Sequence, residues 1–191
     1  MPIALRCGAR LLAALVFAAA GGLAASTPAR AASVVPLTLE EMGRAASDVF
    51  VATVESSEAG WDEAHRLIET KVRLRVERAV KGRAGRRVTL VVPGGVVGNV
   101  GMRAPGAPAY RTGERVLVLA EPGRPGELRT VGFYQGKLPI RRDRVRGIDV
   151  VEPTAFAWGA HGEPIPPGTV PERRPPPLPL DEVIGRLRAL R

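Results

Sequence analysis

The sequence predicts a mainly β protein, a small antiparallel barrel of five or six strands with one short helix before the strands and another after them. Between residues 49 and 151, short runs of β-branched and aliphatic residues recur between turns rich in glycine and proline. Helical signals are confined to two brief stretches, one near residue 40 and one at the carboxyl end. The short, even spacing of the strands favours a closed or partly open barrel over a two-layer sandwich.

The first predicted element is a helix that begins after Thr38. Thr38 is a suitable N-cap residue, and Glu41, three residues later, completes a capping box. A run of apolar, β-forming residues follows at 49–54. Because this run has almost no polar positions, we expect a strand that is covered on both faces.

A long alternating strand is the clearest element of the sequence. Residues 68–77 alternate between apolar and charged side chains, which is the period of a strand with one buried face. The preceding segment, 56–66, is polar and contains Gly60 and Trp61, so it predicts a turn. Residues 88–92 form the next predicted strand. The short connections make these three strands an antiparallel meander.

The second half of the predicted barrel is less regular. Residues 96–109 are rich in glycine and proline, so we expect an ordered loop or a bulged edge there. Residues 115–120 form a strand, and residues 128–140 form another with a kink at Gly136. Residues 144–151 add a last strand in the six-stranded version of this prediction.

The carboxyl-terminal segment differs in composition from the strands. Half of the sixteen residues from 164 to 179 are proline, and this favours an extended, semi-rigid linker, to which we assign 153–179. Residues 173–179 also resemble a polyproline recognition segment. Residues 180–191 follow as a short helix with Asp181 as its N-cap. The apolar stripe that we expect to pack on the barrel consists of Val183, Ile184, Leu187 and Leu190.

The amino-terminal segment has the pattern of a signal peptide. Arg6 and Arg10 supply a positively charged start before an apolar run at 11–25, and Ala29-Arg30-Ala31 provides a small-residue cleavage site. The predicted mature chain begins at Ala32 and works in the periplasm or outside the cell, with no transmembrane segment after cleavage. An uncleaved anchor is the alternative, since the run is near the short end of the spanning range. The predicted organisation is a signal peptide at 1–31, a barrel domain at 32–152, a linker at 153–179 and a helix at 180–191.

Cleavage also changes the charge and the cysteine content. Loss of Arg6, Arg10 and Arg30 lowers the formal net charge of the chain from +9 to +6. Cys7, the single cysteine, is lost as well. The mature chain therefore has no disulfide, no thiol nucleophile and no thiolate metal ligand.

Few residues of this sequence could carry catalysis at neutral pH. His65 and His161 are the two histidines, and no pair of candidate ligands has the spacing of a metal motif. A hydrolase that uses His65 with Asp62 or Glu63 is the least favoured hypothesis, because carboxylates in a turn are usually just solvated. The sequence therefore predicts a non-enzymatic protein with no catalytic residue, no metal and no cofactor.

The alternating strand carries a cationic face formed by Lys71, Arg73 and Arg75. Single-strand nucleic-acid binders place aromatic residues among such charges so that bases can stack, and this face has none. Export also removes nucleic acid as a partner. An anionic envelope polymer is the counterpart that this face would attract.

Short motifs recur along the chain in a characteristic order, and they cover about residues 37–140. They are Leu37-Thr38-Leu39-Glu40-Glu41, residues 48–54, the Trp61 turn, Val80-Lys81-Gly82, Pro93-Gly94-Gly95, residues 113–117 and Gly132-Phe133-Tyr134-Gln135-Gly136-Lys137. This order resembles a family of uncharacterised exported bacterial proteins. Those proteins are similar in fold to the OB-type barrel of tissue inhibitors of metalloproteinases and to netrin-like modules. The resemblance therefore implies an OB-like barrel.

The resemblance also implies a mode of action. In the inhibitors, the amino-terminal residue presents its amine to the zinc of the protease, so Ala32 and Ser33 would enter the cleft of an exported partner such as a metalloprotease. The chain departs from that pattern because it has no cysteine to hold the terminus. The predicted function is an exported protein-binding module, protease-inhibitor-like, and the alternative is an envelope-associated structural module that binds a polyanionic surface. The candidate partner-binding residues are Ala32, Ser33, Trp61, Lys71, Arg73 and Arg75.

Overall fold

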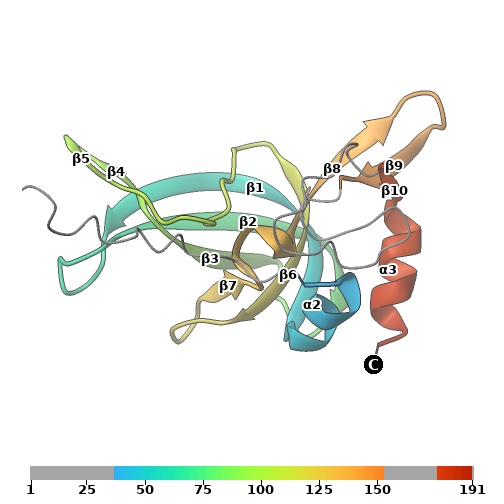
Figure 1. The fold of residues 1–191 in the computed structure, drawn as a ribbon, viewed down its shortest axis with the longest axis horizontal. Coiled ribbons are helices and arrows are strands. Elements are labelled where there is room, and N and C mark those ends of the chain that lie inside the picture. The colour runs from blue at the N-terminus through green and yellow to red at the C-terminus, as the bar shows by residue number, and fades with distance from the viewer. Residues whose placement is uncertain (1–36, 153–175, 191) are drawn as a thin grey trace, which may run out of the picture. The chain divides into compact units, whose positions relative to one another are not determined.

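Five strands close into an OB-like barrel in the computed structural model, which describes residues 37–152 and 176–190 (Figure 1). Their order around the barrel is β1 (Asp48–Trp61), β2 (Ile68–Lys81), β3 (Arg87–Pro93), β7 (Leu128–Thr130) and β6 (Arg115–Pro122), and β6 pairs back with β1. Neighbouring strands are antiparallel except β3 and β7, which are parallel at Leu90 and Leu128. The mainly β class and the small barrel predicted from the sequence are confirmed.

The remaining described elements extend the barrel or cover it. They are α2 (Leu39–Ala45), β4 (Gly95–Val97), β5 (Val100–Met102), the 3₁₀ turn η2 (Phe133–Gly136), β8 (Lys137–Asp143), β9 (Ile148–Val151), β10 (Leu178–Pro179) and α3 (Leu180–Arg188). β4 and β5 form a separate hairpin, whereas β8, β9 and β10 continue the sheet beyond β6. β7 and β8 pair with successive parts of the same edge of β6, and η2 separates them. The sequence predicted a single strand at 128–140 with a kink at Gly136, but the structure has two strands there, and this turn separates them.

The capping box predicted for the first helix is present. The Thr38 hydroxyl accepts the backbone N–H of Glu41 at 3.1 Å, and the Glu41 carboxylate accepts the backbone N–H of Thr38 at 2.8 Å. These two bonds satisfy amides that the first helical turn leaves without partners. They therefore fix where α2 begins and how the chain enters β1.

β1 is buried on both faces because it separates two hydrophobic cores. Val49 and Val51 face an outer core shared with the helices, whereas Phe50, Ala52 and Val54 fill the barrel interior. β6 alternates in the same way, with Leu117 and Leu119 outside and Val116, Val118 and Ala120 inside. The apolar run at 49–54 was predicted to be covered on both faces, and this is confirmed.

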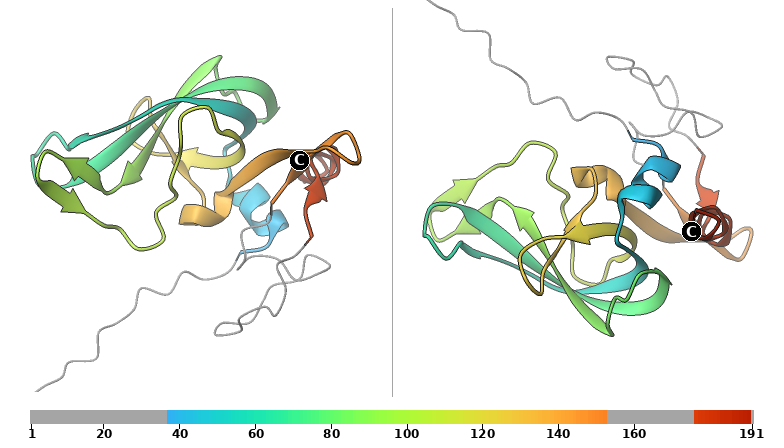
Figure 2. Two further views of the ribbon diagram at one scale, coloured as in Figure 1. Left: turned by 90° about the horizontal axis from the view of Figure 1, so that it is seen from above. Right: turned by 90° about the horizontal axis from the view of Figure 1, so that it is seen from below.

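The two helices close the outer core. Val183, Ile184 and Leu187 of α3 are buried there with residues of α2, and Arg186 bonds to Glu40 of α2 at 2.7 Å. The predicted docking of the carboxyl-terminal helix is thus confirmed. Figures 1 and 2 show both helices at the opposite end of the barrel from the β4–β5 hairpin. None of the helices in the described ranges is long and apolar enough to cross a membrane.

Two sequence predictions about the barrel strands were wrong. The segment 56–61 is not part of a turn: β1 continues to Trp61, and the turn is formed by 62–67. The polar composition of 56–61 misled the prediction, because a two-stranded ribbon that leaves the barrel can be exposed on both faces. Residues 96–109 were expected to lack regular strands, yet β4 and β5 lie within 95–102.

The carboxyl-terminal boundaries also differ from the prediction. Pro179, not Asp181, occupies the N-cap position of α3, and the Asp181 carboxylate instead accepts a bond from Arg78 at 2.9 Å. The last two residues of the predicted linker form β10, which pairs with Val150 and Val151. Proline is tolerated there because β10 is a short edge strand. Residues 153–175 of the predicted linker lie outside the described residues.

Replacing Ile184 by alanine should test whether the outer core depends on α3. Removal of a fully buried branched side chain should lower the free energy of unfolding by about 3 kcal/mol, measured by urea denaturation. The matched control is Leu67→Ala, because Leu67 is exposed and its loss should cost no more than about 0.5 kcal/mol. Equal losses for the two variants would contradict the docking of α3.

Candidate functional site

The described chain begins at a junction with η2, which we call the amino-terminal surface. The backbone N–H of Leu37 donates to the side-chain oxygen of Gln135 at 2.8 Å. Gln135 is fully buried, and its amide nitrogen lies 3.2 Å from the carbonyl oxygen of Gly132. Gln135 thus ties two segments that are 98 residues apart in the sequence. Ala32 and Ser33 lie outside the described residues.

Phe133 is the unusual residue of this surface. Its φ of 58° is in the left-handed region, which is strained for an aromatic residue, and its side chain is 47% exposed. The following residues hold it in place: Tyr134 donates its backbone N–H to Gly106 at 3.0 Å, and Gly136 donates to Val131 at 3.0 Å. A side chain at Gly136 would lie 2.5 Å from the Val131 oxygen, so only glycine fits.

A mostly apolar hollow of about 320 Å³ lies beside Phe133. Val91, Val92, Pro93 and Pro108 supply its apolar wall, and Glu121 and Arg129 lie at its charged side. The two charged side chains form an ion pair of 3.7 Å with each other. The Phe133 ring is thus exposed next to an apolar hollow, and the charged residues at the edge of the hollow neutralise each other. Protein-binding surfaces have this composition.

A buried polar cluster supports the loop that borders this hollow. The Lys137 ammonium group contacts the Glu114 carboxylate at 2.7 Å, bonds to the carbonyl of Ala109 and lies 4.8 Å from the centre of the Tyr110 ring. The Tyr110 hydroxyl bonds to Thr130 at 2.9 Å. Burial raises the pKa of Tyr110 far above its usual range. The sequence analysis did not predict this cluster, since nothing local marks Lys137 as buried.

The second candidate region is the ribbon formed where β1 and β2 leave the barrel. β1 pairs with β6 only as far as Thr53. Val54 then exchanges backbone bonds of 2.9 Å with Gly113 and Glu114, and an irregularity follows between Val54 and Ser56. Beyond it, β1 pairs with β2 alone as far as Trp61.

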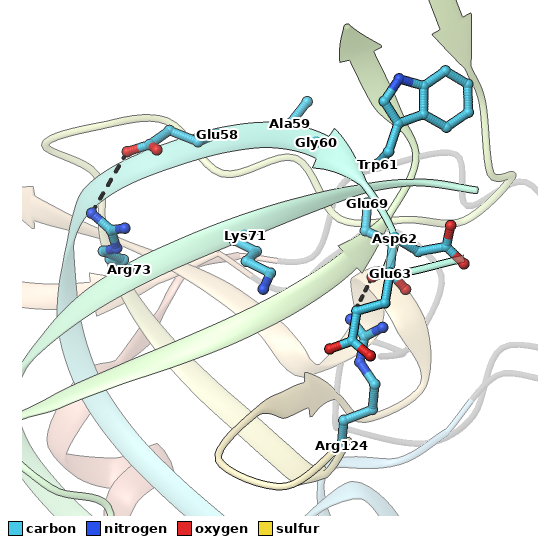
Figure 3. A pocket seen from close by; sticks show the side chains of 10 residues that line it. All are labelled: Glu58, Ala59, Gly60, Trp61, Asp62, Glu63, Glu69, Lys71, Arg73 and Arg124. Atoms are coloured by element: carbon cyan, nitrogen blue, oxygen red, sulfur yellow. Dashed lines mark hydrogen bonds and ion pairs between the residues drawn. The ribbon is translucent and has the colours of Figure 1, made fainter. Parts of the chain in front are cut away.

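The register separates the predicted site residues onto two faces of this ribbon. Trp61 is paired with Ile68, whose side chain faces inward, whereas Glu58 is paired with Lys71, whose side chain faces outward. Figure 3 shows the Trp61 indole pointing away from Lys71 and Arg124. Lys71, Arg73 and Arg75 share the outer face as predicted, but Trp61 does not lie with them.

Each cation of the predicted cationic face has an acidic partner. Lys71 lies 3.3 Å from Glu127, Arg73 lies 3.8 Å from Glu58, and Arg75 lies 3.7 Å from Glu55. Since all three are exposed by more than half, the individual pairs are weak. Their effect is to neutralise the field that would attract a polyanion.

Arg124, which the sequence analysis did not single out, organises the pocket on this outer face (Figure 3). Its guanidinium bonds to Glu127 at 2.8 Å and to Glu69. These bonds raise the pKa of Arg124. The Glu127 carboxylate accepts bonds from Arg124 and Lys71, and these bonds lower the pKa of Glu127. The pocket of about 210 Å³ is lined by four carboxylates and three cations, so it is not a cationic site. The carboxylates are Glu58, Asp62, Glu63 and Glu69, and the cations are Lys71, Arg73 and Arg124.

The residues considered for hydrolysis form the turn between β1 and β2. The Asp62 carboxylate accepts the backbone N–H groups of Leu67 at 3.0 Å and Arg66 at 2.7 Å, which lowers the pKa of Asp62. The backbone N–H of His65 donates to the Asp62 carbonyl oxygen at 2.9 Å. Asp62 therefore serves as a turn-forming residue. Within the described ranges, no group of three or more His, Cys, Asp or Glu side chains is arranged to hold a metal.

The inner face of the ribbon carries the β4–β5 hairpin. A Cβ at Gly95 would lie 2.6 Å from the Ala59 Cβ, so the absence of a side chain permits this close approach. Thr70 donates its hydroxyl to the carbonyl of Gly94 at 2.7 Å, and Gly94 donates its N–H to Ile68 at 2.8 Å. The hairpin and the ribbon together form what we call the hairpin end. Its exposed apolar side chains are Trp61, Leu67, Val96 and Val100.

Comparison with known proteins finds no matching protein family and no matching curated protein. The resemblance to the exported bacterial family stays a prediction from the sequence.

The buried Tyr110 predicts a specific loss of stability at high pH. Its pKa is raised in the folded state, so its contribution is complete below the unfolded value of about 10 and falls as the pH rises above that value. We therefore expect the urea midpoint to fall as the pH rises from about 10 to about 12. In Tyr110→Phe this pH dependence should be smaller, and an unchanged slope would show that the phenol is not the cause.

Removing acidic partners should increase binding to a polyanion. Glu58→Gln and Glu127→Gln free Arg73 and Lys71, so both variants should elute from a heparin column at higher salt than the wild type. Asp181→Asn is the control, because its partner Arg78 lies away from this pocket. A large drop in retention for Lys71→Gln in the otherwise wild-type chain would instead show that the outer face already binds polyanions.

Proposed function

We propose that this chain is an exported, non-enzymatic protein-binding module whose partner docks on the amino-terminal surface. The observation that carries the proposal is the exposed, strained Phe133 beside the apolar hollow. Backbone strain in a residue that is not buried gives the fold no evident benefit, and such strain is concentrated at functional sites. Aromatic anchors next to hollows are also the residues that dominate binding energies at protein interfaces.

The inhibitor-like form of this proposal adds the residues that precede Leu37. Its support is positional: Gln135 holds the Leu37 amide next to η2, so the mature terminus predicted at Ala32 is five residues from this anchored point. An extended chain advances by about 3.3 Å per residue, so five residues can span about 17 Å. In this form of the proposal, Ala32 and Ser33 enter the same cleft that receives Phe133. In this arrangement the hollow and Phe133 form the rim, and a protease is the favoured class of partner.

The alternative, a module that binds a polyanionic surface, has less support. The three cations proposed for it are paired with carboxylates, and the adjacent pocket has more acidic than basic side chains. At the edge of the Phe133 hollow, Glu121 and Arg129 also neutralise each other, so apolar contact is expected to be the main source of affinity. Binding should therefore persist when salt is added.

Capture of a partner from envelope and secreted fractions tests the proposal. The bait is the mature chain, residues 32–191, in three forms: wild type, Phe133→Asn and Val145→Ser. Asparagine tolerates the left-handed backbone and removes the ring, so Phe133→Asn should keep the unfolding free energy within about 0.5 kcal/mol and reduce capture about tenfold or more. Val145 is 97% exposed on the β8–β9 hairpin and serves as the matched control.

The outcomes separate the candidate functions. Recovery of one protein by the wild type and by Val145→Ser, at low and at moderate salt, supports the proposal, and loss of capture when residues are added before Ala32 supports its inhibitor-like form. Equal recovery by Phe133→Asn would refute the role of this surface. Recovery of envelope polymer alone, lost on addition of salt, would favour the alternative.

A further inference from the structure

The outer half of β1 has an unpaired backbone edge. In an antiparallel pair, the N–H and C=O of one residue point to the same side, and successive residues alternate. Gly94 donates its N–H to the Ile68 carbonyl, so Ile68 and Thr70 direct their backbone groups toward β3. Their partners in β1, Trp61 and Ala59, therefore direct theirs away from β2.

The pattern at the base of the ribbon agrees with this assignment. Val54 exchanges its backbone bonds with Gly113 and Glu114 on the side away from β2. After the irregularity at 54–56, Ser57 is the next residue directed to that side, followed by Ala59 and Trp61. No backbone hydrogen bond joins these three residues to another part of the described chain on that side. All three are exposed, so the edge is open to a further strand.

A hollow lies along the inner face of this edge. It has a volume of about 410 Å³, and Ser57 borders it on the ribbon. Its other walls are mainly small or apolar and include Pro93, Gly94, Ala107 and Tyr110. A strand added beside Ser57 would direct every second side chain into this hollow.

We propose that this edge pairs with the same edge of a second copy of the chain. One antiparallel register uses all three open residues: Ala59 faces Ala59 of the second copy, and Ser57 faces Trp61. In this register the Trp61 indole, 41% exposed in the single chain, enters the hollow beside Ser57 of the other copy. The open edge, the exposed indole and the unfilled hollow are thus explained by one symmetric contact.

The side chains of the outer face fit the same register. Glu58 lies opposite Gly60 of the second copy, so the two Glu58 carboxylates do not face each other across the new pair. Each Glu58 also keeps its neighbour Arg73 within its own ribbon. Like charges directly opposite each other would oppose pairing, and this register avoids them. The contact does not use Phe133, Leu37 or Gln135, although Pro93 borders both this hollow and the Phe133 hollow.

Sedimentation equilibrium of the mature chain, residues 32–191, from about 1 to 300 μM tests this proposal. The ladder is short, so we expect a reversible dimer with a micromolar dissociation constant. Ala59→Pro removes an edge N–H, and Trp61→Ser removes the indole. Each should weaken dimerisation about tenfold or more. The matched controls are Ala59→Ser, which keeps the N–H, and Val96→Ser, an exposed apolar residue off the edge; both should behave as the wild type.

Amide exchange provides a second measurement that does not depend on Ala59→Pro folding. As the concentration rises, the amides of Ser57, Ala59 and Trp61 should become protected, whereas those of Ser56, Glu58 and Gly60 should be protected throughout. A chain that stays monomeric over this range would overturn the proposal. So would a dimer that Trp61→Ser leaves unchanged, since it must use another surface. If Phe133→Asn loses partner capture but still forms the dimer, the result supports the proposed function and shows that the dimer uses a different surface.

Discussion

β1 and β6 are each buried on both faces, and this double burial dictates how the other elements are arranged around them. A strand with apolar side chains on both sides is stable only if both sides are covered. Phe50 and Val118 fill the barrel, so Val49, Val51, Leu117 and Leu119 need a second cover outside it. The helices α2 and α3 provide that cover, although they lie at opposite ends of the sequence.

The same constraint explains where the candidate surfaces lie. Where β1 passes Val54 it no longer pairs with β6, and from that point its sequence becomes polar. The ribbon that results is held by β2 and by the close approach of Gly95, and it leaves one backbone edge open. At the other candidate surface, the interruption of the strand between β7 and β8 produces η2 and exposes Phe133. Both surfaces therefore arise where a barrel strand departs from regular pairing.

The high net positive charge of the chain does not produce a cationic surface on β2. The chain has a formal net charge of +9, and three of its cations share one strand face. In the fold, that face meets carboxylates from β1 and from the β6–β7 turn, such as Glu58 and Glu127. The local field is therefore set by which strands become neighbours. A net charge describes the whole chain and cannot locate a binding site.

Features that depend on neighbouring residues can be predicted from the amino-acid sequence alone. These are the capping box at Thr38, the alternation of β2, the doubly covered run at 49–54 and the apolar stripe of α3, because side-chain spacing encodes each directly. The closed fold was needed to establish the parallel closure of β3 on β7, the bond from Leu37 to Gln135, the bond from Arg124 to Glu69 and the open edge of β1. Each of these joins, or leaves unjoined, groups far apart in the chain. Their meeting depends on how the whole barrel closes, and no local pattern records it.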